Sequence, residues 1–178
     1  MISVFVDNNA WDILYRRGVD LLTALPSPDF GLAITREAEF EIASIPDQDL
    51  LAYIRSSISS RQIPTDTYFG FGAPGLPPDQ QRVAGFNRGR YASRAETTIL
   101  AAEAQRIKPT KRPTGLFKNE ADVSLAARSV HSILLTSDKK GLLGQIEAKY
   151  GATVVDLSNW PQGLPLGDFV RSHSLKGN

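Results

Sequence analysis

Short apolar runs alternate with longer helical segments along this chain, and this alternation constrains the fold more than any other feature. Apolar runs at residues 2–6, 30–34, 133–136 and 153–155 have the length of strands buried on both faces of a sheet. Buried strands separated by helices predict an α/β fold, with a parallel β-sheet flanked by helices on both faces. The 178 residues, 42% of them hydrophobic, suffice for one such domain and are too few for two, so we expect a single domain over residues 1–178.

The helical segments are recognised by apolar residues at helical spacing and by residues that favour helix ends. Thr35 fits the N-cap of one helix, and Pro46 with Asp47 begins the next. Helices are predicted over residues 8–25, 35–44, 46–60, 91–107, 119–130 and 139–150, with a short one around 168–170.

Residues 61–90, which we call the insert, are the least regular part of the chain. Proline and glycine are concentrated between Pro64 and Pro78, with aromatic residues interleaved. This composition predicts a long loop or lid, with one short helix at 79–83. A basic connector at 108–113 is predicted to follow the next helix.

The histidine and cysteine content limits the chemistry that this chain can perform. It has no cysteine, which excludes disulfides, thiolate zinc sites, iron–sulfur clusters and cysteine nucleophiles. Its only histidines are His131 and His173, so a histidine-rich catalytic zinc site is excluded as well. A divalent metal would have to be held mainly by oxygen, which favours Mg²⁺ or Mn²⁺.

The hydropathy pattern gives no indication of a membrane segment. No apolar run approaches the roughly 20 residues that span a bilayer. The first residues lack a basic leader, and Asp7 interrupts their apolar run too early for a signal peptide. We therefore expect a cytoplasmic protein that does not contact the membrane.

The formal net charge of +1 conceals an uneven distribution. Residues 55–118 hold eleven lysine and arginine residues and four acids, a net charge of +7, whereas the rest of the chain has a net charge of −6. A basic segment beside acidic flanks would suit a polyanion held over a carboxylate centre, because phosphate contacts supply most nucleic-acid affinity. Solvated helix faces and loops are the alternative, and charge alone does not decide between them.

Two acids stand where predicted strands end. Asp7 directly follows the first apolar run, and Asp138 comes two residues after the run that ends at Thr136. Ligands of open parallel sheets bind beyond the carboxyl ends of the strands, so these two acids are the first to consider. Each could instead be the N-cap of the helix that follows it.

Two further acids are candidates because of their positions on helices. Asp122 sits near the start of an alanine-rich helix, where it could also form a capping-box arrangement with Asn119. Glu41 leans toward the apolar stripe of its own helix, whereas Glu37 and Glu39 lie further round and are better explained as solvated. A carboxylate on the buried side needs a partner, because an unpaired buried charge is costly.

Four carboxylates that converge would repel one another unless a cation neutralised them, so a cluster of these acids is best understood as a metal site. One or two Mg²⁺ ions held there would activate water and stabilise the leaving oxygen in phosphodiester hydrolysis. Neither histidine has a nucleophile context, so no Ser-His-Asp or Cys-His site competes with this interpretation.

The acids belong to four motifs that occur in a fixed order. In chain order, these are an apolar strand with D-x-N at Val4 to Asn9, Thr35 with Glu41 six residues later, Asp122 opening an alanine-rich helix, and an apolar strand with T-x-D at Ile133 to Asp138. In this order and spacing, from residue 1 to about 157 outside the insert, the chain resembles the PIN-domain nuclease family, and within it the toxin ribonucleases of the virulence-associated-protein C kind. It departs from that pattern at Asn8, where threonine is common, at the bulkier Trp11, and in its longer insert.

The resemblance implies a single PIN-like domain that acts as a Mg²⁺- or Mn²⁺-dependent endoribonuclease and hydrolyses RNA phosphodiester bonds. The residues that would ligate the metal and carry catalysis are Asp7, Glu41, Asp122 and Asp138, supported by Asn9 and Thr136, with Glu39 and Glu120 as accessory acids.

RNA is the expected substrate, and the basic segment 82–118 is expected to position its backbone. The residues that we expect to contact phosphates are Arg88, Arg90, Lys111 and Arg112. In the toxin subgroup, the chain would be the toxin of a type II toxin–antitoxin pair. Its partner would be a small antitoxin that covers the site, and it would form a homodimer.

Two other functions fit part of the sequence. A phosphatase of the haloacid-dehalogenase type also places an aspartate after its first strand, but its chemistry requires D-x-D, and Asn9 occupies the second position. A catalytically silent PIN-fold module that binds RNA or protein is the other alternative, although all four acids are present. An assay with two substrates separates the three functions. Hydrolysis of single-stranded RNA indicates the nuclease, hydrolysis of a small phosphomonoester indicates the phosphatase, and hydrolysis of neither indicates the silent module.

Overall fold

The computed structural model describes residues 1–72, 74–138 and 140–174. A five-stranded, all-parallel sheet forms its centre, with the strand order β3-β2-β1-β8-β9. These strands are β1 (Ile2–Val6), β2 (Phe30–Thr35), β3 (Thr65–Asp66), β8 (Ile133–Thr136) and β9 (Thr153–Asp156). The predicted α/β fold is confirmed, and it is consistent with a single PIN-like domain.

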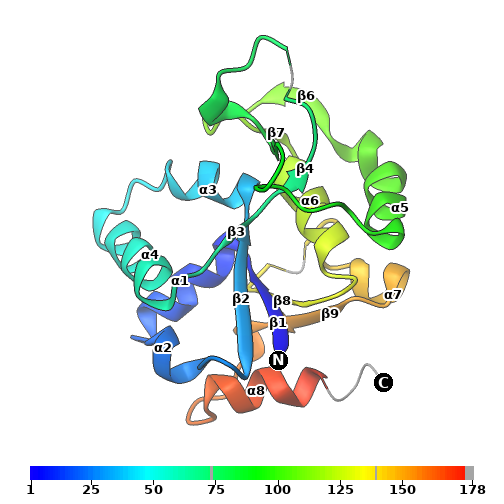
Figure 1. The fold of residues 1–178 in the computed structure, drawn as a ribbon. Helices are drawn as coiled ribbons and strands as arrows, with labels where there is room; N and C mark the ends of the chain where they lie inside the picture. Colours follow the sequence, from blue (N-terminus) through cyan, green and yellow to red (C-terminus); the bar gives the residue numbers. More distant parts are fainter. Residues whose placement is uncertain (73, 139, 175–178) are drawn as a thin grey trace.

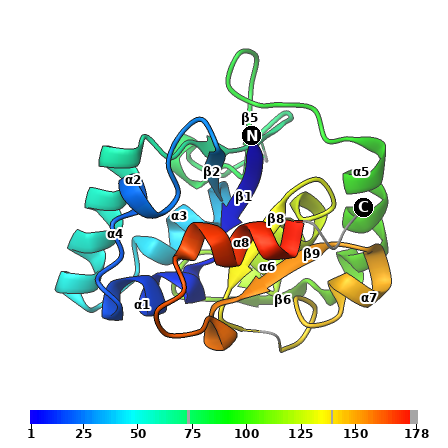
Figure 2. The ribbon, with the colours of Figure 1, turned by 90° about the horizontal axis from the view of Figure 1, so that it is seen from below.

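Helices cover both faces of the sheet. They are α1 (Asn8–Arg16), α2 (Leu21–Ala24), α3 (Arg36–Ile42), α4 (Gln48–Arg61), α5 (Arg94–Glu103), α6 (Glu120–Arg128), α7 (Ile146–Tyr150) and α8 (Leu166–Ser174), with 3-10 turns η1 (Pro78–Gln80), η2 (Ala104–Arg106) and η3 (Leu157–Asn159). Figure 1 shows α1, α2 and α4 on one face and α5, α6 and α7 on the other. Figure 2 shows α8 lying across the amino ends of the strands. None of the described helices has the length and apolar character needed to cross a bilayer.

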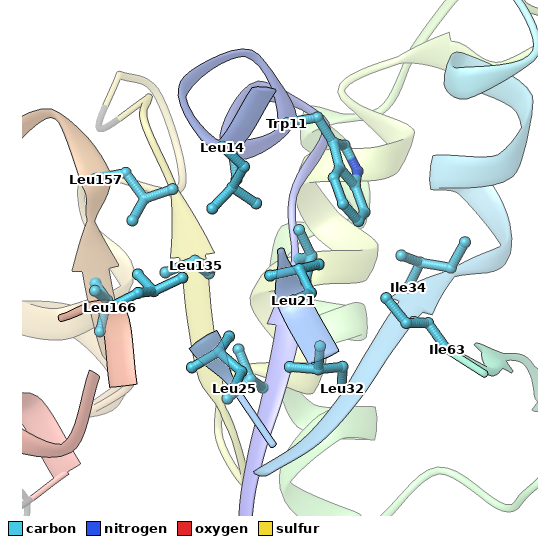
Figure 3. Packing of buried hydrophobic residues seen from close by; sticks show 14 of the residues in the cluster. Trp11, Leu14, Leu21, Leu25, Leu32, Ile34, Ile63, Leu135, Leu157 and Leu166 are labelled. Carbon is cyan, nitrogen blue, oxygen red and sulfur yellow. The ribbon is translucent and has the colours of Figure 1, made fainter. Parts of the chain in front are cut away.

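The core is divided by the sheet, because successive residues of a strand point to opposite faces. Phe5 and Leu134 pack in the cluster on the side of α5 and α6. On the opposite side, Leu135 lies with Trp11 and Leu14 of α1 in the larger cluster, part of which is shown in Figure 3. Full burial of such a side chain contributes about 1.5–3 kcal/mol, which is why the central strands are apolar on both faces.

The single helix predicted over residues 8–25 is wrong, because α1 and α2 are separate helices. Gly18 lies between them with φ of 59°, a left-handed conformation that ends a helix and favours glycine. The backbone N–H of Val19 donates to the carbonyl of Leu14 at 3.0 Å and closes α1. Asp20 then caps α2 through its side chain. Gly18 was therefore the signal that apolar periodicity alone overlooked.

The helix predicted over residues 139–150 is also mostly wrong. Only α7 at its carboxyl end is helical, and residues 141–145 form turns. Gly141 has φ of 62°, which an α-helix does not accommodate. Lys139, where the prediction begins, lies outside the described residues. The other predicted helices are present with shifted ends, and Thr35 caps α3 by accepting a hydrogen bond from the N–H of Ala38 at 3.1 Å, as predicted.

The insert is only partly a loop. Its β3 pairs with β2 at the edge of the central sheet, and β4 (Tyr68–Phe69) pairs with β5 (Val83–Ala84) in a small parallel sheet. The short helix predicted at 79–83 is wrong, since η1 is a single 3-10 turn and Val83 belongs to a strand. These strands have two residues each and no periodicity, so tertiary pairing rather than local pattern determines them.

The basic connector predicted at 108–113 forms most of an antiparallel hairpin, which we call the basic hairpin. In it, β6 (Lys108–Lys111) pairs with β7 (Phe117–Lys118). The N–H of Arg112 donates to the carbonyl of Leu116 at 2.7 Å and closes the turn. Figure 1 shows this hairpin beyond the carboxyl ends of the central strands, on the same side of the molecule as the insert.

An ion-pair network fastens the insert to the body of the domain. Arg128 of α6 is only 1% exposed, and its Nε donates to Oδ2 of Asp66 in β3 at 2.6 Å. Arg90 donates to both oxygens of Asp66 and, through Nη1, to Oε2 of Glu96 at 2.9 Å. Burying these charges is tolerated because each has a partner of opposite sign.

Candidate metal centre

The four acids singled out in the sequence lie on elements that meet at the carboxyl edge of the sheet. Asp7 follows β1, Asp138 comes two residues after β8, Glu41 is in α3, and Asp122 is in the first turn of α6. Electrostatic interactions connect all of them, between Asp7 and Glu41, Asp7 and Asp122, Glu41 and Asp122, and Asp122 and Asp138. The structure thus places each of these carboxylates, from four separate segments, within electrostatic range of at least one other.

Asp7 is the most deeply placed of these acids, with 4% of its surface exposed. Thr136 at the end of β8 donates its hydroxyl hydrogen to Oδ2 of Asp7 at 2.7 Å, and Nδ2 of Asn9 donates to the same oxygen at 3.3 Å. Asp7 stands at the N-cap position of α1, yet its side chain does not cap that helix. The capping interpretation of Asp7 is therefore not what the structure shows.

Burial raises the pKa of Asp7 above its ordinary value of 3.8, because it removes water from the charged form. Hydrogen bonds from the side chains of Thr136 and Asn9 and from the backbone of Asn8 act to lower this pKa. The nearby charge of Asp122 raises it further. An acid buried in this way has a strong electrostatic reason to accept a cation.

Glu41 is half-buried and has the partner that its position requires. Nδ2 of Asn8 donates to Oε2 of Glu41 at 2.5 Å, and Nη1 of Arg112 donates to Oε1 at 3.3 Å. Burial raises the pKa of Glu41 above its ordinary value. The hydrogen bond from Asn8 and the charge of Arg112 act to lower this pKa, whereas the charges of Asp7 and Asp122 raise it further.

Asn8, which the sequence marked only as a departure from the family pattern, belongs to the site. Its Nδ2 faces Glu41, while its Oδ1 is buried and has no hydrogen-bond partner among the described residues. A buried amide oxygen without a partner is energetically unfavourable. Such an oxygen is also a ligand that hard divalent cations accept.

Asp122 does not form the capping box that its spacing allowed. Asn119 has a left-handed backbone and makes no side-chain cap for α6. Burial raises the pKa of Asp122, the guanidinium of Arg112 lowers it, and the charge of Asp138 raises it. Arg112 of the basic hairpin is therefore a positive charge within range of two of the four carboxylates.

Asp138 is held by its neighbours at the end of β8. Its backbone N–H donates to Oγ1 of Thr136 at 3.0 Å, and its Oδ1 accepts from the N–H of Lys140 at 2.7 Å. The second bond resembles the N-cap interpretation, but the described residues 140–145 are a bend and turns, and the next described helix, α7, begins only at Ile146. Thr136 is thus shared by Asp7 and Asp138.

These residues form a suitable donor set for Mg²⁺ or Mn²⁺, since four carboxylates and the free oxygen of Asn8 are all hard oxygen ligands. In the part of the chain that the structure describes, however, no three Asp, Glu or His side chains are close enough to hold a metal ion as they stand. The guanidinium of Arg112 lies among the acids in this arrangement.

The basic residues expected to contact phosphates differ in their availability. Arg88 and Lys111 are exposed and have no ion-pair partner within the described residues. Arg112 contacts Glu41, as described above. Arg90 is committed to Asp66 and to Glu96, so its guanidinium has little left to offer a phosphate.

Three other glutamates of the sequence analysis have structural partners. Glu37, expected to be solvated, is buried and accepts a hydrogen bond from Ser124 of α6 at 2.7 Å, because α3 packs against α6 as well as against the sheet. Glu39 contacts Arg36 and Thr65. Glu120 pairs with Arg82 at 2.9 Å.

The comparisons with known proteins add no assignment. No family model, no curated protein and no solved structure matches this chain.

Proposed function

We propose that this chain is a metal-dependent endoribonuclease of the PIN type, which hydrolyses phosphodiester bonds in RNA. The observation that carries the proposal is the placement of four acids at the carboxyl edge of a parallel sheet, where Asp7, Glu41 and Asp122 interact electrostatically with one another and Asp122 interacts with Asp138. This is the edge at which open α/β sheets bind ligands. The order of the four motifs in the sequence points to the same chemistry.

The four acids would hold Mg²⁺ or Mn²⁺, which supplies charge stabilisation and water activation when bound. Thr136 and Asn9 hold the Asp7 carboxylate in one orientation through their hydrogen bonds. Asn8 holds Glu41 in the same way. Such supporting hydrogen bonds orient ligands and tune their affinity for a metal.

The RNA backbone would be held by the basic side of the site. The segment 55–118 carries a net charge of +7, and it includes the exposed Arg88 and Lys111. Positive charge beside a carboxylate centre attracts the phosphates and raises the local concentration of the polyanion.

The test is cleavage of labelled single-stranded RNA with Mg²⁺ or Mn²⁺ and with a chelator. We expect cleavage that requires the cation and is lost in Asp7→Asn and in Asp122→Asn. Asp12→Asn is the matched control, because Asp12 is an exposed aspartate of α1 outside the site. Cleavage that persists in Asp7→Asn or in the chelator would contradict the proposal. Tight RNA binding without cleavage would favour a silent binding module, and hydrolysis of a small phosphomonoester would favour a phosphatase.

Because the chain resembles the toxin ribonucleases of the PIN-domain family, we extend the proposal and infer that it is a cytoplasmic toxin. It would act as a homodimer and be neutralised by a small antitoxin. Induced expression should then arrest growth, and co-expression of a short neighbouring reading frame should relieve the arrest. Asp7→Asn should be harmless when expressed. Growth arrest that is equally strong with Asp7→Asn would overturn the toxin role. Light scattering of the purified protein gives its oligomeric state.

A further inference from the structure

A cavity of about 330 Å³ lies between the insert and the basic hairpin. Phe71, Leu76 and Val83 of the insert line it on one side, and Phe117 and Lys111 of the hairpin line it on the other. Its walls are thus largely apolar, although it opens at the surface. The fold does not need this cavity for its core, which lies elsewhere against the central sheet.

The two aromatic walls are unusually exposed for phenylalanine. Phe71 is 89% exposed and Phe117 is 43% exposed. Phe71 packs edge-on against Phe69 of β4, with ring centroids 6.2 Å apart. Its ring is therefore supported from the insert while much of its surface faces solvent. Exposed apolar surface of this kind is characteristic of a binding site.

The charged groups of the cavity are arranged asymmetrically. Arg82 is neutralised by Glu120 at 2.9 Å, and its Nη2 donates to the carbonyl of Gly115 at 2.7 Å, so this pair fastens the insert to the hairpin and to α6. Lys111 is exposed and has no ion-pair partner among the described residues. The cavity therefore presents aromatic surface together with one available positive charge.

The cavity adjoins the acid cluster through two short chain connections. Lys111 lines the cavity, and the next residue, Arg112, donates to Glu41. Glu120 also lines the cavity, and Asp122 follows two residues later in α6. Consecutive Cα atoms are about 3.8 Å apart, so the cavity and the acid cluster share two backbone segments, one in the basic hairpin and one in the first turn of α6.

We propose that this cavity binds a nucleobase of single-stranded RNA next to the phosphodiester bond at the acid cluster. Phe71 and Phe117 supply the stacking surface, and Lys111 contacts a flanking phosphate. Aromatic surface beside positive charge is the combination by which proteins hold single-stranded nucleic acids. The inference rests on the proposed function and adds to it that a base of the RNA, as well as its backbone, is recognised.

The size of the cavity favours a base over a protein segment as its occupant. Stable protein–protein interfaces bury more than about 1,000 Å² in total, which requires a broad surface rather than one small cavity. The net charge of +7 on the segment 55–118, to which both walls belong, is complementary to a polyanion.

The test measures binding, so that it does not depend on catalysis. In the Asp7→Asn background, fluorescence anisotropy compares a short labelled single-stranded RNA of mixed sequence with the same strand made abasic. We expect Phe71→Ala and Phe117→Ala each to weaken binding of the normal strand by roughly 5- to 150-fold, the range for loss of one stacked base. Neither should change binding of the abasic strand.

Two controls distinguish stacking from charge and from folding. Phe86→Ala removes another exposed phenylalanine of the insert that does not line the cavity, and it should leave both affinities unchanged. Lys111→Ala should weaken both strands and reduce the slope of log affinity against log salt by about one. Thermal melting of each variant should match the parent, because the side chains removed are exposed.

The outcomes separate this inference from the proposed function. If wild-type cleavage is lost in Asp7→Asn but Phe71→Ala and Phe117→Ala bind RNA like Phe86→Ala, the base site is wrong and the nuclease stands. If the two substitutions weaken only the normal strand but the wild type never cleaves RNA, the base site stands and the nuclease is wrong. Absence of RNA binding, or capture of a protein on this surface in place of RNA, overturns the inference.

Discussion

Thr136 donates its hydroxyl hydrogen to Oδ2 of Asp7 at 2.7 Å, and the same hydroxyl oxygen accepts the N–H of Asp138 at 3.0 Å. The Thr136 side chain is fully buried between these two acids. One hydroxyl at the end of β8 therefore fixes the positions of two of the four carboxylates. Its role in the proposed metal centre can be examined without altering any carboxylate.

We predict that Thr136→Val weakens Mn²⁺ binding by about 10- to 100-fold, the usual cost of removing a group that orients a ligand. Valine has nearly the same shape as threonine but cannot donate to Asp7. Thr136→Ser keeps the hydroxyl and should remain close to wild type. Isothermal titration with Mn²⁺ and the rate of RNA cleavage are the measurements. If Thr136→Val and Thr136→Ser bind Mn²⁺ equally well, the hydroxyl has no part in holding the site.

A second prediction concerns Asp7 and the pH dependence of stability. Burial raises the pKa of Asp7, so the folded protein binds this proton more tightly than the unfolded chain does. Its favourable contribution is complete below the ordinary pKa of 3.8 and is lost as the pH rises through the raised value. Asp7→Asn should therefore increase the free energy of unfolding at neutral pH in a chelator, as measured by urea unfolding.

Addition of Mn²⁺ should reverse this difference in stability and make the wild type more stable than Asp7→Asn. A cation at 100 times its dissociation constant stabilises the protein that binds it by about 2.7 kcal/mol, roughly 5–10 °C in Tm for a domain of this size. Wild type should gain this increase and Asp7→Asn should not, while Asp12→Asn should behave as wild type. An equal increase in Tm for Asp7→Asn would exclude Asp7 as a ligand.

The central sheet was predictable because its strands are buried on both faces. That burial requires continuous apolar runs, and β1, β2, β8 and β9 all have them. The edge strand β3 could not be predicted, since Thr65 and Asp66 have no apolar pattern and are extended by pairing with β2. Pairing with the neighbouring strand β2, and not the composition of β3 itself, determines the conformation of β3.

The places of Asp7 and Asp138 beyond the ends of β1 and β8 were predictable, because the apolar runs specify where those strands end. The surroundings of the acids were not. Asn8 contacts Glu41, and Arg112 reaches the same carboxylate from a hairpin 71 positions away. Glu37 was expected in solvent because the helical pattern shows only one packing face, whereas α3 also packs against Ser124 of α6. Contacts between elements are a property of the tertiary structure.

A third prediction concerns Arg112, whose guanidinium donates to Glu41 at 3.3 Å and lowers the pKa of both Glu41 and Asp122. A divalent cation bound by these acids has to compete with that charge. Arg112→Gln should tighten Mn²⁺ binding by about two- to five-fold, the equivalent of one exposed ion pair.

The same substitution should weaken RNA binding, because it removes a positive charge from the substrate side of the site. Arg94→Gln is the matched control, since Arg94 is exposed at the start of α5 and the change in net charge is the same. If Arg112→Gln and Arg94→Gln shift the two affinities alike, Arg112 acts only through the overall charge.

The last prediction concerns Glu96, which is 1% exposed and links Arg90 to the start of α5. Burial alone would raise the pKa of Glu96, but hydrogen bonds from Arg90 and Ser93 lower it from 4.5 to about 2. Its contribution is therefore present above pH 4.5 and lost as the pH falls toward 2, opposite in sign to that of Asp7.

Glu96→Gln preserves the capping geometry but removes the charge. It should lower the free energy of unfolding at neutral pH by about 1.5–3 kcal/mol, the value of hydrogen bonds to a charged group. Urea unfolding at a series of pH values should show a weaker decline below pH 4.5 for Glu96→Gln than for wild type or Asp12→Asn. Parallel curves for all three proteins would mean that the insert is not held by this charge.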